Sequence, residues 1–275
     1  MEIINNYEHK LTPEEKWEQA TLANNFIFYK VMRQHQDACK QLLEMLLGIK
    51  IESMEMKQEE TIALDYDSKG IRLDVFVKDT GRMFDVELQV ANTKELPERA
   101  RYYQGVMDVD TLKAGQKYKE LRDSHIIFIC LEDVFKNGLP VNTFANICLE
   151  DGKTKFGDRT YKHFFFAPLC AKMIEDKEVK AFFEFLISNQ ASSSYTDELK
   201  NYVADAKQST ENKMQFMTWE RQRAYDFEAG VQQKAVEAAE QLIKMNILSA
   251  EQIATAVNLP LEQVLEIKEK ISVKA

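Results

Sequence analysis

The sequence RLDVFVKDTGRMFDVELQV, residues 72–90, combines the pattern of a β-hairpin with three acidic residues. The DTGR segment between its two apolar runs is a turn signal, because glycine accepts the positive φ that tight turns require. Asp74, Asp85 and Glu87 lie among valine, phenylalanine and leucine residues. Charged side chains are costly inside a sheet unless something offsets their cost, so the segment predicts a hairpin and raises the question of what compensates its acidic residues.

The turn fixes which residues pair across the hairpin. If Thr80 and Gly81 form a two-residue loop, the numbers of paired residues sum to 161, as 80 and 81 do. A four-residue loop keeps the same parity, whereas a three-residue loop would not. One face of the hairpin then carries only apolar pairs beyond the turn: Val77 with Phe84, Val75 with Val86, and Leu73 with Leu88.

The other face of the hairpin carries the acidic residues. Asp74 pairs with Glu87, Phe76 pairs with Asp85, and Gln89 follows on the same side. Directly opposed residues have Cβ atoms about 4.5–5.5 Å apart, and like charges at that distance destabilise the pair. A divalent cation such as Mg²⁺ is the simplest compensation, since hard cations bind carboxylate oxygens. The alternative is a half-exposed hairpin with a solvated acidic face, and the pattern by itself leaves both open.

Composition describes a globular protein of moderate size. The chain has 275 residues, of which 45% are hydrophobic and 29% charged, and this fits one large domain or one domain with an appendage. We find no apolar run of 18 residues and no signal peptide at the start, so we expect a cytoplasmic protein with no membrane span. The net charge of −9 argues against general coating of nucleic acid, although an acidic nuclease site stays compatible with it.

Cysteine and histidine spacing argues against zinc. The four cysteines are widely separated, with no C-x-x-C pair, and the histidines form no H-x-x-x-H pair. We therefore interpret the cysteines as small buried thiols in a reducing compartment.

Periodicity along the chain predicts an α/β core followed by helices. A helix over 11–32 begins with a Thr12–Glu15 capping box and Pro13. A second helix over 36–48 ends at Gly48. The remaining expected elements are strands near 51–56, 61–66, 71–79, 82–90, 124–131, 143–150 and 160–167, a helix over 96–113, and helices from 176 onward. We expect a core over residues 1–190 and a helical C-terminal extension over 191–275.

Four short motifs carry a family resemblance. RLDVFV, FDVELQ, RARYYQ and HIIFIC occur in the order and spacing of the PD-(D/E)xK nuclease family transposases, also called recombination-promoting nucleases. The resemblance runs from about residue 24 to 240. It implies a small mixed β-sheet flanked by helices, and a Mg²⁺- or Mn²⁺-dependent endonuclease acting on DNA. The family name also implies a bacterial protein that acts on mobile DNA, in recombination or in phage defence.

The resemblance assigns roles to residues by position. Asp74 and Glu87 match the two acidic residues that hold the metal, with the Leu88 carbonyl as a further ligand. Gln89 stands where the broader superfamily has lysine, and its amide would orient the attacking water. Asn25 stands where the family often has aspartate, which implies a weaker second metal site. These two departures put the strength of catalysis in question rather than the location of the site.

The helix after the hairpin offers further polar groups. Helical spacing places Arg99, Tyr102 and Tyr103 on neighbouring faces. An arginine there can contact phosphate, supported by a tyrosine or by Gln104, whereas the alternative is amphipathic packing with an exposed arginine. We select Arg101 and Tyr103 as supporting candidates and leave the choice of arginine open.

The tail over 239–271 predicts short helices broken at NILSA and NLP. Its outline resembles a helix-turn-helix, but a helix that enters the major groove brings basic or amide groups. The last helix instead carries three glutamates against two lysines: Glu262, Glu266 and Glu269, with Lys268 and Lys270. Its apolar faces fit a small bundle that packs on itself or on a second copy, which would make the chain a homo-oligomer.

The leading hypothesis is a metal-dependent DNA endonuclease. Its main rival is a catalytically weak or inactive nuclease-fold module that acts in DNA binding or oligomerisation. A third interpretation is an interaction protein whose acidic hairpin is merely solvated.

Overall fold

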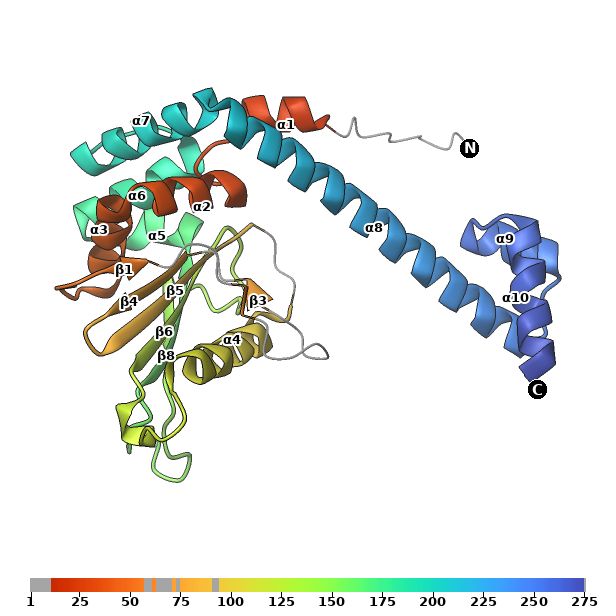
Figure 1. Cartoon of the computed structure of the whole chain (residues 1–275), viewed down its shortest axis with the longest axis horizontal. Helices are drawn as coiled ribbons and strands as arrows, with labels where there is room; N and C mark the ends of the chain where they lie inside the picture. Colours follow the sequence, from red (N-terminus) through yellow and green to blue (C-terminus); the bar gives the residue numbers. More distant parts are fainter. Residues whose placement is uncertain (1–10, 57–60, 63–70, 73–74, 91–93, 275) are drawn as a thin grey trace. The chain divides into compact units, whose positions relative to one another are not determined.

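A mixed six-stranded sheet forms the centre of the computed structural model, which describes residues 11–56, 61–62, 71–72, 75–90 and 94–274 (Figure 1). In spatial order the strands are β1 (Glu55–Met56), β4 (Val75–Asp79), β5 (Arg82–Gln89), β6 (Asp123–Cys130), β8 (Thr160–Phe166) and β7 (Val141–Phe144). The central strands β5, β6 and β8 are parallel, and the outer neighbours are antiparallel. A separate antiparallel pair joins β2 (Thr61–Ile62) to β3 (Ile71–Arg72).

The hairpin register that the sequence predicts is confirmed over its described part. Val75 pairs with Val86, and Val77 pairs with Phe84, so paired numbers sum to 161. Gly81 has a φ of +96°, which the two-residue loop requires. The predicted pairs of Leu73 and Asp74 lie outside the described residues.

Helices cover both faces of the sheet (Figure 1). The helix α4 (Leu96–Thr111) packs on one face, where its apolar residues join a buried cluster with β6 and β8 that includes Leu96, Ala100, Met107, Phe128 and Phe164. Figure 1 shows α2 (Asn25–Gln34), α3 (Gln36–Leu47) and α6 (Lys177–Ser188) on the other side. The helices up to residue 208 are α1 (Pro13–Gln19), α2 (Asn25–Gln34), α3 (Gln36–Leu47), α4 (Leu96–Thr111), the 3₁₀ turn η1 (Tyr118–Glu120), α5 (Ala167–Met173), α6 (Lys177–Ser188) and α7 (Ser194–Gln208).

The N-terminal region forms two helices where the sequence predicts one. The capping box is present, because Thr12 N–H donates to Glu15 Oε2 at 2.7 Å and Glu15 N–H donates to Thr12 Oγ1 at 3.1 Å. The chain leaves the helical path after α1, and Asn24 caps α2 by accepting hydrogen bonds from Phe26 and Ile27 N–H. The expected continuous helix is therefore wrong, because a local asparagine cap starts a second one.

Two other expectations need correction downstream. The predicted strand over 143–150 is instead β7, which ends at Phe144, and only an isolated bridge between Ile147 and Lys155 follows. The sequence pattern predicts helices only from residue 176 onward, whereas the structure has the short helix α5 directly after β8, where Pro168 in its first turn suits a helix start. By contrast, Gly48 ends α3 at a φ of +63°, as predicted.

The chain divides into two compact units. One comprises residues 17–210 and contains the sheet, and the other comprises residues 211–275 with the segment that ends at Lys16. The second unit contains α8 (Thr210–Met245) from Glu211 onward, together with α9 (Ala250–Val257) and α10 (Leu261–Lys274). The predicted breaks separate α8 from α9 and α9 from α10. The last turns of α8 pack with α9 and α10 around a small apolar core of their own that includes Ala239, Ile253, Leu259, Val264 and Ile267. No helix in the described part of the chain is both long enough and apolar enough to cross a bilayer.

This small core gives a prediction about local stability. Val264 is fully buried, whereas its neighbour Leu265 is 48% exposed. Val264→Asp should unfold α9 and α10, because an unpaired charge would enter the apolar core, while Leu265→Asp should not. Hydrogen exchange would show lost protection over 250–271 with β6 still protected. Equal protection of the tail in both variants would contradict the assignment of this core.

Candidate active site on strand β5

Three polar side chains of β5 lie on one face of the sheet and are buried. Asp85 is 0%, Glu87 5% and Gln89 9% exposed. They alternate along the strand, so they share the face that α4 covers. The interpretation of a merely solvated acidic face is therefore wrong for these residues. Asp74, the predicted partner of Glu87, lies outside the described residues.

Arg99 of α4 contacts both functional candidates on β5. Its Nη2 atom lies 3.1 Å from Glu87 Oε2 and 2.9 Å from Gln89 Oε1. A guanidinium nitrogen can only donate, so the oxygen of the Gln89 amide faces Arg99, and the NH₂ group is the other end of the amide. The arrangement joins a carboxylate, an amide and a cation within hydrogen-bonding distance.

Aromatic rings hold the Arg99 guanidinium in place. Its central carbon lies 5.5 Å from the centroid of Tyr103, one helical turn later, and 5.0 Å from that of Phe128 on β6. Both distances are within the range of cation–π attraction. The Arg99 side chain is 28% exposed, so solvent reaches it. The site therefore has an open side next to a fixed positive charge.

The other polar residues of α4 have different surroundings. Arg101 is exposed, and Tyr102 is 37% exposed. Gln104 is buried and donates to the Ser124 carbonyl at 3.2 Å. Ser124 pairs with the start of β5, whereas Gln89 lies at the end of that strand. Tyr103 packs against the core cluster and against Arg99. The structure thus brings Arg99, rather than Arg101, to β5.

Sequence spacing predicts the helix α4 but does not show which of its arginines approaches β5. Arg99 and Arg101 have the same side chain, and only the way α4 packs on the sheet decides which of them reaches the strand. Asn25 is the first residue of α2 and is half-buried, and the neighbouring Asn24 supplies the cap.

The donor set on β5 fits a hard divalent cation. Glu87 offers carboxylate oxygens, and Asp85 adds a second buried carboxylate on the same face. Mg²⁺ and Mn²⁺ prefer oxygen ligands of this kind. Within the described ranges no three His, Cys, Asp or Glu residues cluster as a complete ligand set, and Asp74 is not among those residues.

Two other reactive-looking groups do not belong to this site. Cys130 pairs with Gln89 across the sheet, but burial raises the pKa of its thiol to about 12, against the opposing charge of Arg99. His125 and His163 approach to 3.1 Å between ring nitrogens on the opposite face of the sheet, and burial lowers the pKa of each to about 4. We infer that the thiol stays protonated and the imidazoles stay neutral at pH 7.

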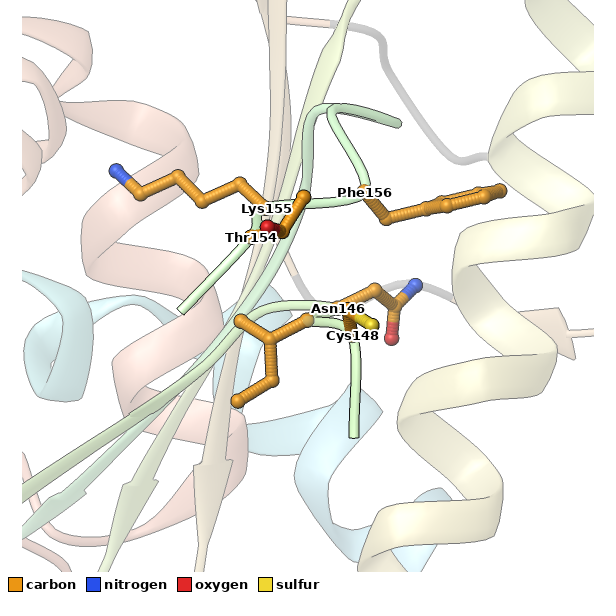
Figure 2. A pocket seen from close by; sticks show the side chains of 6 residues that line it. Asn146, Cys148, Thr154, Lys155 and Phe156 are labelled. Carbon is orange, nitrogen blue, oxygen red and sulfur yellow. The ribbon is translucent and has the colours of Figure 1, made fainter. Parts of the chain in front are cut away.

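A surface hollow lies elsewhere, in the loop that follows β7. It has a volume of about 540 Å³ and is lined by residues 146–148 and 154–156. Figure 2 shows that the Lys155 and Phe156 side chains point to opposite sides of this loop. The lining contains no carboxylate, so it offers no ligand set for a hard cation, and the buried cluster on β5 is the better candidate.

A mixed sheet flanked by helices, with a buried carboxylate on its central strand, defines an α/β protein. Residues 23–240 match the family model described as PD-(D/E)XK nuclease family transposase. This match covers most of the chain, and the protein belongs to that family. Comparisons with curated proteins and with solved structures give no match. The predicted family and fold class are confirmed, and the family supports a nuclease role connected with mobile DNA.

Proposed function

We propose that this protein is a metal-dependent DNA endonuclease that hydrolyses phosphodiester bonds. The observation that carries the proposal is the burial of Glu87 beside Gln89 and Arg99 on a central strand. A carboxylate is costly to bury, and even when an arginine pairs with it, a buried ion pair is often no more stabilising than apolar packing, so its retention there favours a functional role. Membership in a nuclease family supports the same chemistry.

The metal would be Mg²⁺ or Mn²⁺. Asp74 and Glu87 would hold it through carboxylate oxygens, with the Leu88 carbonyl as a further ligand. A bound divalent cation supplies Lewis acidity toward a phosphoryl oxygen and lowers the pKa of water.

Gln89 would position the attacking water. Its amide oxygen accepts from Arg99 at 2.9 Å, which fixes the orientation of the amide. The NH₂ group of this amide is the group that would hold a water oxygen by hydrogen bonding. An amide adds no positive charge, so Gln89 orients the water without stabilising the charge on the phosphate. Asn25 would weaken a second metal site.

A plasmid-cleavage assay tests the proposal. The purified chain should nick or linearise supercoiled DNA with Mg²⁺ or Mn²⁺, and excess EDTA should stop the reaction. A chain that binds DNA but leaves the plasmid intact with either metal would instead be the inactive nuclease-fold module. Cleavage that continues in EDTA would contradict the metal requirement.

The predicted pairing of Asp74 with Glu87 gives a stability prediction. If the hairpin register continues to Asp74, two like charges would face each other without metal only in the folded state, so Asp74→Asn should stabilise the metal-free protein by roughly 0.2–1 kcal/mol. The same change should abolish the rise in melting temperature on adding Mg²⁺, because that rise requires binding to the native state. Melts of both proteins in EDTA and in Mg²⁺ measure the two effects. If Asp74→Asn is less stable than wild type in EDTA, and Mg²⁺ does not change the melting temperature of the wild type, then Asp74 is a structural hydrogen-bond acceptor and not a metal ligand.

The C-terminal unit would serve self-association rather than base reading. Several of its apolar side chains are exposed, including Met245 at 63%, Ile247 at 77% and Leu265 at 48%. The exposed glutamates of α10 oppose entry into the major groove. Light scattering on the full chain measures the mass, and a monomer at all concentrations would remove this part of the proposal.

A further inference from the structure

We propose that Arg99 is the counter-ion of Glu87 in the metal-free protein, and that metal binding displaces it from Glu87 while Gln89 retains it. Arg99 would thus be a positioning residue that competes with the metal. The proposal rests on the proposed function, because it concerns the same metal site. It adds a regulating contact to that site.

The burial of Glu87 is the first step of the argument. A carboxylate that is 5% exposed requires a partner, because a buried unpaired charge is strongly unfavourable. Arg99 Nη2 lies 3.1 Å from Glu87 Oε2 and supplies that charge. The carboxylate that would hold the metal therefore already contacts a cation, and a metal that binds it must overcome this contact.

The way Arg99 is held is the second step. The same Nη2 atom donates to Gln89 Oε1 at 2.9 Å, and the rings of Tyr103 and Phe128 flank the guanidinium. None of these three contacts requires Glu87. When the carboxylate turns to a metal, the guanidinium is still held within the site.

The third step concerns charge. Position 89 carries a neutral amide, so β5 provides no positive charge next to Glu87. Arg99 brings a guanidinium from α4 to within hydrogen-bonding distance of that amide. A guanidinium suits a phosphate, which it binds through two parallel N–H groups. Release from Glu87 would therefore leave this charge available to the phosphate of the substrate.

The test compares Arg99→Gln with Arg101→Gln. Both variants remove one positive charge from α4 two residues apart, but Arg101 is exposed and Arg99 contacts Glu87. Calorimetric titration with Mn²⁺ should give a Kd about tenfold lower for Arg99→Gln than for wild type. Arg101→Gln should stay within about twofold of wild type, because its charge is screened by solvent.

Melting in EDTA gives a second readout that does not depend on metal or on cleavage. Arg99→Gln should melt about 5 °C lower than wild type, because the buried Glu87 carboxylate loses the compensating charge of Arg99. The double variant Glu87→Gln/Arg99→Gln should recover most of that loss, since neither charge remains. If Arg99→Gln fails to fold, Arg99→Lys is the substitute, because it keeps the charge without the planar fork. Its Kd for Mn²⁺ should be lower than that of Arg101→Gln, but by less than about tenfold.

The outcomes separate this inference from the proposed function. If the wild-type protein binds no Mn²⁺, the proposed metal site is wrong, and so is the displacement of Arg99 by metal. The melts in EDTA still test whether Arg99 and Glu87 form an ion pair. A wild type that binds Mn²⁺, with equal Kd values for the two arginine variants, overturns only the competition. Unchanged melting of Arg99→Gln in EDTA overturns the counter-ion role.

Discussion

Glu87→Gln should lower the rate of metal-dependent plasmid cleavage by at least about 100-fold. The substitution removes the negative charge that would hold the metal but keeps the size of the side chain and an oxygen that accepts from Arg99. Each tenfold loss of rate corresponds to about 1.36 kcal/mol, so this loss requires about 2.7 kcal/mol of lost charge stabilisation, which one metal ligand can supply. Asp74→Ala should have an effect of the same size. Initial rates of conversion from supercoiled to nicked DNA, at saturating Mg²⁺, measure both effects.

A matched control separates loss of chemistry from loss of charge. Glu98 is an exposed acidic residue in the first turn of α4, next to Arg99. Glu98→Gln makes the same chemical change outside the buried cluster, and it should cut DNA at close to the wild-type rate. Near-normal cleavage by Glu87→Gln would remove β5 from the catalytic site.

The register of the hairpin could be predicted because it depends on local rules. Side chains alternate with a period of two, and Gly81 fixes the loop, so one turn assignment determines which residues share a face. That parity placed Asp85, Glu87 and Gln89 together, as the structure does. It could not show that this face is buried, because burial depends on α4, which lies further along the chain.

The choice of arginine could not be predicted for a related reason. Arg99 and Arg101 both lie on the first turns of α4, and sequence spacing describes only their angle around the helix. Which of them meets Glu87 depends on how Leu96 and Ala100 pack into the core beneath the helix. The split between α1 and α2 is a similar case. The sequence alone allows Asn24 to lie inside a helix or to cap one, and the path of the chain decides that it caps α2.

Asp79 at the turn of the hairpin anchors this framework. It is 2% exposed, and its carboxylate accepts from Arg82 Nε at 3.1 Å and Nη2 at 2.5 Å. It also accepts from the backbone N–H of Ser53 at 3.1 Å, while Arg82 reaches the Lys50 carbonyl at 2.6 Å. The turn is therefore tied to the segment that precedes β1. Because the paired ends of β4 and β5 lie there, Asp79 holds the strand that carries Glu87 without touching the site.

Asp79→Ala should destabilise the sheet unit by roughly 3 kcal/mol, because it leaves the partly buried Arg82 and the Ser53 N–H without their acceptor. This corresponds to a fall in melting temperature of roughly 6–12 °C for a unit of this size. Glu52→Gln is the matched control, since Glu52 is an exposed acidic residue beside Ser53, and it should melt with the wild type. Thermal melts in EDTA measure both. A loss no larger than that of Glu52→Gln would contradict the anchoring role.

The pH dependence of this effect has a definite sign. Burial by itself would raise the pKa of Asp79, but hydrogen bonds from Thr80, Ser53 and Arg82, with the Arg82 charge, lower the pKa overall. A carboxyl whose folded pKa is depressed stabilises the protein fully above its unfolded pKa of about 3.9, and this stabilisation is lost as pH falls through the folded pKa. The difference in unfolding free energy between wild type and Asp79→Asn, which has nearly the same shape, should therefore be constant from pH 7 to about pH 5 and shrink below pH 4. A difference that grows on acidification would mean that burial, not Arg82, dominates the charge of Asp79.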